Sequence, residues 1–104
     1  MAVFDDVGAA YQKQLDNEMT DGIDDDMQCA LAAAAYAEHA AIWADTTVDL
    51  QRYRAAGPNQ LWPWSTQNWS PQSPRADLVR AAALIISQIE KIDRAENPED
   101  GTHL

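Results

Sequence analysis

The stretch DDDMQCALAAAAYAEHAAIWAD, residues 24–45, decides the fold because it predicts one long helix. It is rich in alanine, the best helix former, and it contains neither glycine nor proline. The three aspartates at its start complement the helix dipole. We therefore expect a central helix over residues 24–44, with one stripe packed against a neighbour. The predicted stripe consists of Met27, Leu31, Ala34, Ala35, Glu38 and Ile42.

A shorter amphipathic pattern precedes this stretch. Apolar residues recur every four positions, which predicts a helix over residues 6–18. They are Val3, Val7, Tyr11 and Leu15. Asp5 or Asp6 is the expected N-cap, and Thr20-Asp21-Gly22 predicts a turn.

The segment that follows the central helix is rich in proline and tryptophan. A short helix is expected over residues 47–56, capped by Thr46 or Thr47 and ended by Gly57-Pro58. Residues 57–74 read GPNQLWPWSTQNWSPQSP and predict an ordered flap over the helices. We expect Trp62, Trp64 and Trp69 to cover the core as part of this flap. Contact with a ligand or a partner protein is the second interpretation.

The last helix is predicted from Pro74, with Ser73 as its N-cap. It carries a seam with the spacing of helices that pack lengthwise on others, namely Leu78, Ala82, Ile85, Ile89 and Ile92. Asn97-Pro98 ends it, so residues 97–104 form a polar tail. The prediction is one all-α domain over residues 1–96, a small bundle of three to four helices with a Trp/Pro-rich crossover.

The net charge of −10 is confined to one half of the chain. Residues 1–50 contain Lys13 as their one base, whereas acids and bases balance after residue 50. The acids of the first half are Asp5, Asp6, Asp16, Glu18, Asp21, Asp24, Asp25, Asp26, Glu38, Asp45 and Asp49. This half lacks the basic footprint that nucleic acids require, so a basic partner or a cation suits it better.

Other function classes find little support in the residues. A single cysteine, Cys29, excludes an internal disulfide and is expected to pack in the core. No signal peptide or membrane-spanning run is recognisable, which favours a cytoplasmic protein. No phosphate-binding loop or catalytic motif is found, and we expect no cofactor.

The acidic run of residues 16–26 has three interpretations. It is a solvated turn with helix-capping aspartates, a cation site, or a negative surface for a basic partner. The run fails the EF-hand pattern, which argues against calcium. Glu38 is expected to form a structural ion pair with Arg75, Arg80 or Arg94.

Three stretches together resemble a family of small phage and prophage proteins. They are LAAAAYA (31–37), LWPWSTQNWSP (61–71) and RADLVRAAALIISQIEKIDR (75–94). The family pattern reads AAxxYA, WPWxxxxWxP and LVxAxALIxxEIExLDR. Because those proteins are mostly without assigned function, the resemblance implies a phage context more than an activity.

The last helix is also similar to the end of MazG-type all-α nucleotide pyrophosphohydrolases. That family binds magnesium through EExxE on one helix and ExxD on the next. Here Gln28 and Cys29 stand where the paired acids belong, and alanines occupy the next turn. The resemblance therefore implies binding rather than hydrolysis.

Our first functional hypothesis is a non-enzymatic, anti-CRISPR-like inhibitor that acts in the host cell as a monomer or small homo-oligomer. It would present its acids to a basic host protein, for example a nucleic-acid-handling defence complex. The expected partner-binding residues are Asp21, Asp24, Asp25, Asp26, Asp45 and Asp49. The alternative is a divergent magnesium-dependent MazG-like hydrolase with Glu38, Asp45 and Asp24 as ligands. A phage structural or assembly protein is the third hypothesis.

Overall fold

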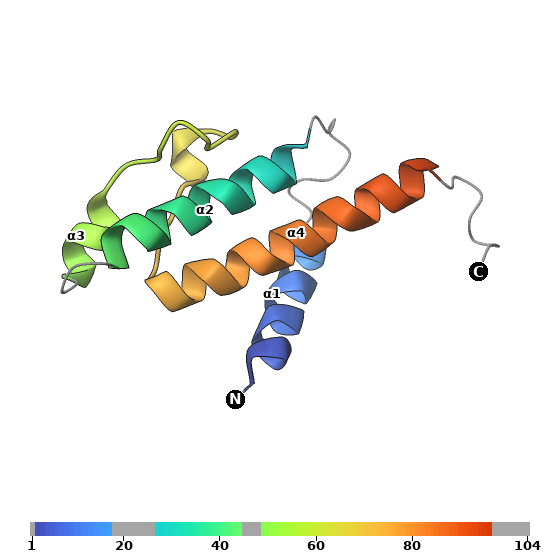
Figure 1. Ribbon diagram of the computed structural model, residues 1–104, viewed down its shortest axis with the longest axis horizontal. Helices are drawn as coiled ribbons and strands as arrows, with labels where there is room; N and C mark the ends of the chain where they lie inside the picture. The colour runs from blue at the N-terminus through green and yellow to red at the C-terminus, as the bar shows by residue number, and fades with distance from the viewer. Residues whose placement is uncertain (1, 18–26, 45–48, 97–104) are drawn as a thin grey trace.

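The computed structural model describes residues 2–17, 27–44 and 49–96, and within these ranges the chain is all-α, as predicted. Two long helices, α2 (Gln28–Ala44) and α4 (Pro74–Glu96), lie side by side and antiparallel (Figure 1). Helix α1 (Val3–Asn17) crosses α4, and the short α3 (Leu50–Ala55) begins the crossover. One 3₁₀ turn, η1 (Thr66–Asn68), lies within residues 57–73, which we call the tryptophan loop.

The observed helix boundaries correct the predicted starts of α1, α2 and α3. Helix α1 begins at Val3, so Asp5 and Asp6 lie in its first turn rather than at its cap. Helix α2 begins at Gln28 and not at residue 24, because Met27 has a φ of 64°, outside the right-handed helical region.

The caps of α3 and α4 are both side-chain oxygens. The Asp49 carboxylate accepts from Gln51 N at 2.9 Å, so this aspartate replaces the predicted threonine caps and α3 is only six residues long. The predicted start of α4 is confirmed, because the Ser73 hydroxyl accepts from Ala76 N at 3.2 Å.

The core lies between α2, α4 and the tryptophan loop. Small residues of α2 let the other two elements approach closely, and the aromatic rings fill the space between them. The buried core residues are Cys29, Ala32, Ala33, Ala35, Tyr36, Trp69, Ala81 and Leu84. No described side chain of α1 is buried, so α1 is the least covered helix.

The two predicted packing stripes were wrong, except for the buried Ala35. In α2, Met27, Leu31, Ala34, Glu38 and Ile42 are exposed. In α4, Leu78, Ile85 and Ile89 are about half exposed, while Ala82 and Ile92 are partly covered. The reason is that α1 and the tryptophan loop cover the opposite side of the helix pair (Figure 1).

In the part of the chain that the structure describes, no helix combines the length and apolar character needed to cross a membrane.

Candidate functional site

The tryptophan loop builds an aromatic cluster on α2. Trp69 stacks on the Tyr36 ring, with ring centroids 4.9 Å apart and planes 6° from parallel. Trp62 meets both rings edge-on, at 5.2 Å from Tyr36 and 5.0 Å from Trp69. Trp64 lies edge-on against Trp62 at 5.3 Å. These geometries are favourable for aromatic pairs and fix the loop against the helix.

Each indole N–H of this loop has an acceptor. Trp62 Nε1 donates to Ser65 O at 3.0 Å, and Trp69 Nε1 donates to Ala56 O at 2.9 Å. Trp64 Nε1 donates to Gln28 Oε1 at 3.1 Å, at the start of α2. The three rings are therefore held in place by polar as well as apolar contacts.

A cavity of about 490 Å³ opens between α1, the tryptophan loop and α4. This volume lies within the usual range for small-molecule sites. Among the described residues, its wall contains two cations, several amides and the partly buried Trp62 and Trp64, but no carboxylate. The lining residues are Ala10, Lys13, Gln14, Tyr36, Trp62, Trp64, Asn68, Ser70, Gln72, Ala76, Arg80 and Leu84.

Several contacts hold the guanidinium group of Arg80 in this wall. Its guanidinium carbon lies 4.4 Å from the Tyr36 ring centroid, a cation–π distance. Nη1 donates to the Tyr36 hydroxyl at 2.6 Å, and Nη2 donates to Ser70 O at 3.2 Å. Asp77 Oδ1 lies 3.7 Å from Nη2 and balances part of the charge. Arg80 thus ties α2, the loop and α4 together while facing the cavity.

Lys13 supplies the second positive charge, from α1. It is exposed on the cavity wall, and no salt bridge joins it to any described residue. Lys13 and Arg80 are the charged groups of the described wall and both are positive, although Asp77 behind the wall balances part of the Arg80 charge and the chain carries a net charge of −10. An anionic group would be favoured at this position.

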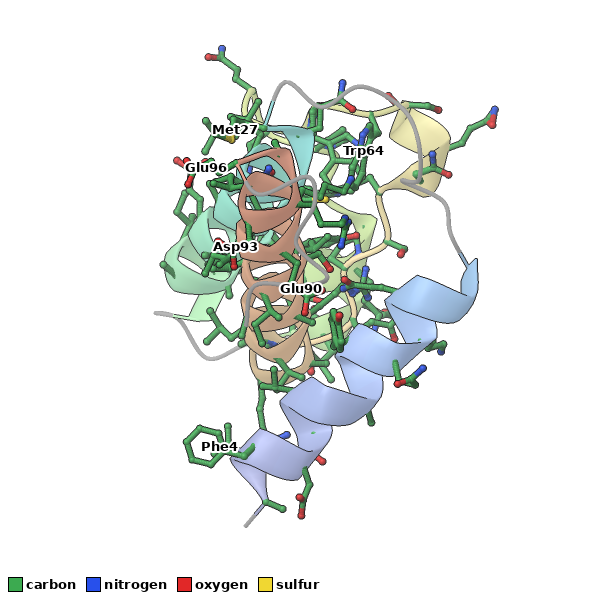
Figure 2. All side chains as sticks on the ribbon, turned by 90° about the vertical axis from the view of Figure 1, so that its right-hand side faces the viewer. Phe4, Met27, Trp64, Glu90, Asp93 and Glu96 are labelled. Atoms are coloured by element: carbon green, nitrogen blue, oxygen red, sulfur yellow. The ribbon has the colours of Figure 1, made fainter. Side chains whose placement is uncertain are left out.

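Helix α1, which forms one side of the cavity, is attached to α4 by polar contacts. The Tyr11 hydroxyl donates to the Glu90 carboxylate, and this hydrogen bond raises the pKa of Tyr11. Figure 2 shows Glu90 directed toward α1. Ser87 Oγ donates to Gln14 Oε1 at 3.1 Å.

Asp77 lies behind the cavity and is fully buried. It accepts from the Tyr53 hydroxyl at 2.6 Å and from Gln72 N at 3.1 Å through each carboxylate oxygen. Burial, followed by the hydrogen bond to Asp77, raises the pKa of Tyr53 well above its ordinary value. This network joins α3, the loop and α4, and its Tyr53 and Asp77 side chains are closed to solvent.

The predicted acidic site is only partly described. Asp21, Asp24, Asp25, Asp26 and Asp45 lie outside the described residues. Asp49 lies at the α3 N-cap, where its carboxylate accepts two backbone N–H groups.

The other candidates fall into separate environments. Glu38 is exposed, and the predicted ion pair is wrong for two of its partners, since Arg75 pairs with Asp6 and Arg80 with Asp77. Cys29 is buried in the core. No group of three possible metal ligands is found among the described side chains.

Sequence reasoning missed Arg80, Lys13 and Asp77. The sequence predicts Arg80 only as a possible ion-pair partner of Glu38, because its contacts with Tyr36 and Ser70 join distant parts of the chain. Asp77 had a local signal, an acid in the first turn of a helix that begins Ser-Pro. Nothing local predicts that Lys13 faces the loop.

Comparison of the chain with protein-family models, with curated proteins and with solved structures finds no match. The function is therefore inferred from the site itself.

Proposed function

We propose that this chain is a binding protein for a small aromatic anion, held in the cavity between α1, the tryptophan loop and α4. The observation that carries the proposal is the composition of the described wall, in which Lys13 and Arg80 are the charged groups and lie beside Trp62 and Trp64. Indole faces stack on planar rings, and guanidinium and ammonium groups pair with phosphate or carboxylate. A nucleoside monophosphate combines both features and suits the cavity volume.

The test is a titration with adenosine monophosphate, followed through the indole N–H signals in NMR spectra. We expect the Trp62 and Trp64 signals to shift, and Lys13→Met to weaken binding by about 5- to 20-fold, as for loss of one charge-assisted contact. Arg52→Met is the matched control, because Arg52 is exposed on α3, away from the cavity.

Two outcomes would count against this function. One is the absence of any indole shift with the monophosphate or with an aromatic carboxylate such as indole-3-acetate at millimolar concentration. The other is an equal effect of Arg52→Met and Lys13→Met, which would show that only net charge matters.

A second candidate function is supported by the charge distribution. We propose, as the alternative, that the chain is an inhibitor that presents the acids of residues 16–49 to a basic site on another protein. The resemblance to phage and prophage proteins suggests that this partner is a host protein. Capture from a host lysate should then fall steeply between low and high salt, and Asp24/Asp25/Asp26→Asn should abolish it. Capture that is unchanged by salt and by this variant would argue against it.

A further inference from the structure

The side of the α2–α4 pair that faces away from the tryptophan loop is largely apolar, apart from Glu38 in the α2 stripe, and no described element covers it. We call it the open face and define it by Met27, Leu31, Ile42, Leu78, Ile85 and Ile89. These side chains are 40 to 59% exposed. Isolated exposed apolar residues are ordinary, but these six, on α4, on α2 and just before α2, give a patch on the order of 500 Å², the size of the largest patch on a typical monomer, which is often functional.

The two stripes lie on the same side of the molecule. Figure 2 shows Met27, the residue before α2, on the same side as Asp93 and Glu96 of α4, with Trp64 on the opposite side. Asp93 is one helical turn beyond Ile89, so it marks the direction in which the α4 stripe points. Phe4 of α1, 87% exposed, is directed to this side as well.

The spacing along α4 indicates what covers the open face. Leu78, Ala82, Ile85, Ile89 and Ile92 follow at intervals of four and three, the seam of helices that pack lengthwise at a shallow angle. Such a seam is matched by another helix of similar length and spacing. An identical seam in a second copy of this chain meets that requirement.

Charge complementarity also favours a second copy. Arg75 and Glu96 stand near the two ends of α4, so a two-fold axis halfway between them brings each opposite its counterpart in an antiparallel pair. That midpoint falls between Ile85 and Ile86, close to the centre of the seam. Arg75 pairs with Asp6 of α1 at 2.9 Å, so it must leave α1 to meet Glu96 of the second copy; both side chains of the pair are exposed, and such a pair exchanges partners at little cost.

The same two-fold axis also relates the α2 helices of the two copies. Gln88 Oε1 accepts from Ala30 N at 2.9 Å, which fixes the alignment of the antiparallel helices within one chain. The middle of the α2 stripe therefore lies within about two residues, roughly 3 Å along the helix, of the middle of the α4 seam. A two-fold through both centres stacks α2 on α2 and α4 on α4 of the two copies, giving four helices around a new core.

The available area suits a specific dimer. A standard interface buries about 800 Å² per partner, somewhat more than half of it apolar. The open face supplies about that apolar share from the six residues alone, and Phe4 adds to it. We propose that this chain forms an antiparallel two-fold homodimer through the open face.

The proposal is tested by sedimentation velocity on the full chain at micromolar to submillimolar concentration. We expect a dimer that persists or tightens as salt is raised, because the apolar contact is retained and repulsion between two chains of charge −10 is screened. Ile85→Glu and Ile89→Glu should give monomers of unchanged helicity. Leu61→Glu, a similar change on the tryptophan loop, should remain dimeric.

A charge exchange tests the antiparallel register. Arg75→Glu and Glu96→Arg should each weaken dimerisation several-fold, and the double variant should restore it. A double variant as weak as the single ones would overturn the register.

The dimer itself would be overturned by a monomeric wild type at every concentration, or by a dimer that survives Ile85→Glu. Binding of the monomer to phosphatidylcholine vesicles, lost in Ile85→Glu, would identify a membrane surface as the occupant instead.

Discussion

Tyr53 and Asp77 show how a single buried pair organises the half of the molecule behind the cavity. Both side chains are completely shielded from solvent, and their hydrogen bond joins α3 to the first turn of α4. Asp77 also accepts the Gln72 N–H, so the carboxylate closes the tryptophan loop at its end. A buried carboxylate is tolerated here because it has several donors.

Tyr53→Phe should destabilise the fold by about 1–3 kcal/mol, because Asp77 loses its shortest hydrogen bond while remaining buried. The experiment is urea unfolding of wild type and variant at pH 8. A loss below about 0.5 kcal/mol would show that the hydrogen bond contributes little.

Because burial raises the pKa of Tyr53, the stability of the wild type and of Tyr53→Phe should depend differently on pH. Below pH 10 tyrosine is protonated in both folded and unfolded chains, so the Tyr53 contribution to stability is constant. Above pH 10 the unfolded chain releases the Tyr53 proton while the folded chain keeps it, so wild-type stability falls. Tyr53→Phe should lose stability more slowly between pH 10 and 11, and parallel curves would contradict the assignment.

At the scale of the elements, the tryptophan loop acts as a packing layer rather than a linker. Asn59 Nδ2 donates to Ala35 O at 3.0 Å, and Trp69 stacks on Tyr36, so both ends of the loop are fixed to α2. Arg54 Nε donates to Gln72 O at 2.9 Å and attaches the end of the loop to α3. The loop replaces the additional helix that would otherwise cover this side.

Trp69→Ala should therefore lower the free energy of unfolding by about 3–5 kcal/mol, the range for loss of a large core aromatic. Amide hydrogen exchange should show that protection is lost through residues 57–73 together. Leu61→Ala, in the same loop but 36% exposed, is the control and should cost much less. Equal effects of the two variants would mean that the aromatic stack does not hold the loop.

The elements also show how far sequence reasoning reached. The helical class, the Ser73 cap and the end of α3 before Gly57 were predictable, because each depends on composition or on neighbouring residues. The buried faces were not. In α4 the most regular apolar seam is exposed, while Ala81 and Leu84 are buried, since the choice of face depends on α1 and the loop.

The candidate site was predictable only in part. The tryptophans were identified from the loop sequence, but the cavity also needs Lys13, Arg80 and Tyr36, which lie on three different helices. Pairings over more than 40 residues, such as Arg80 with Tyr36, leave no periodic signal in one sequence. The acidic residues were conspicuous in the sequence because they are close neighbours along the chain.

For the whole molecule, the proposed dimer and the cavity occupy opposite sides of the α2–α4 layer. Trp64 and the open face point in opposite directions in Figure 2. Two copies joined through their open faces would therefore leave both cavities accessible. Ligand binding and dimerisation can then be measured independently in the same variants.

Glu38 is the charged residue in the middle of the α2 stripe, and it should weaken the dimer. Glu38→Leu is expected to lower the dissociation constant about tenfold, since a charge is no longer desolvated in the interface. Glu38→Gln should be intermediate, because it removes the charge and keeps the polar group. Sedimentation equilibrium measures all three, and weaker association of Glu38→Leu would contradict the placement of α2 in the interface.

The rate at which a thiol reagent labels Cys29 can report how often this protein opens. It is the single thiol of the chain and is buried between α2 and its neighbours, only 1% exposed. A thiol reagent therefore reaches the sulfur only when the layers separate, and the slow labelling rate reports how often that happens. Because the chain has no second cysteine, this readout needs no engineered probe and applies unchanged to every variant discussed above.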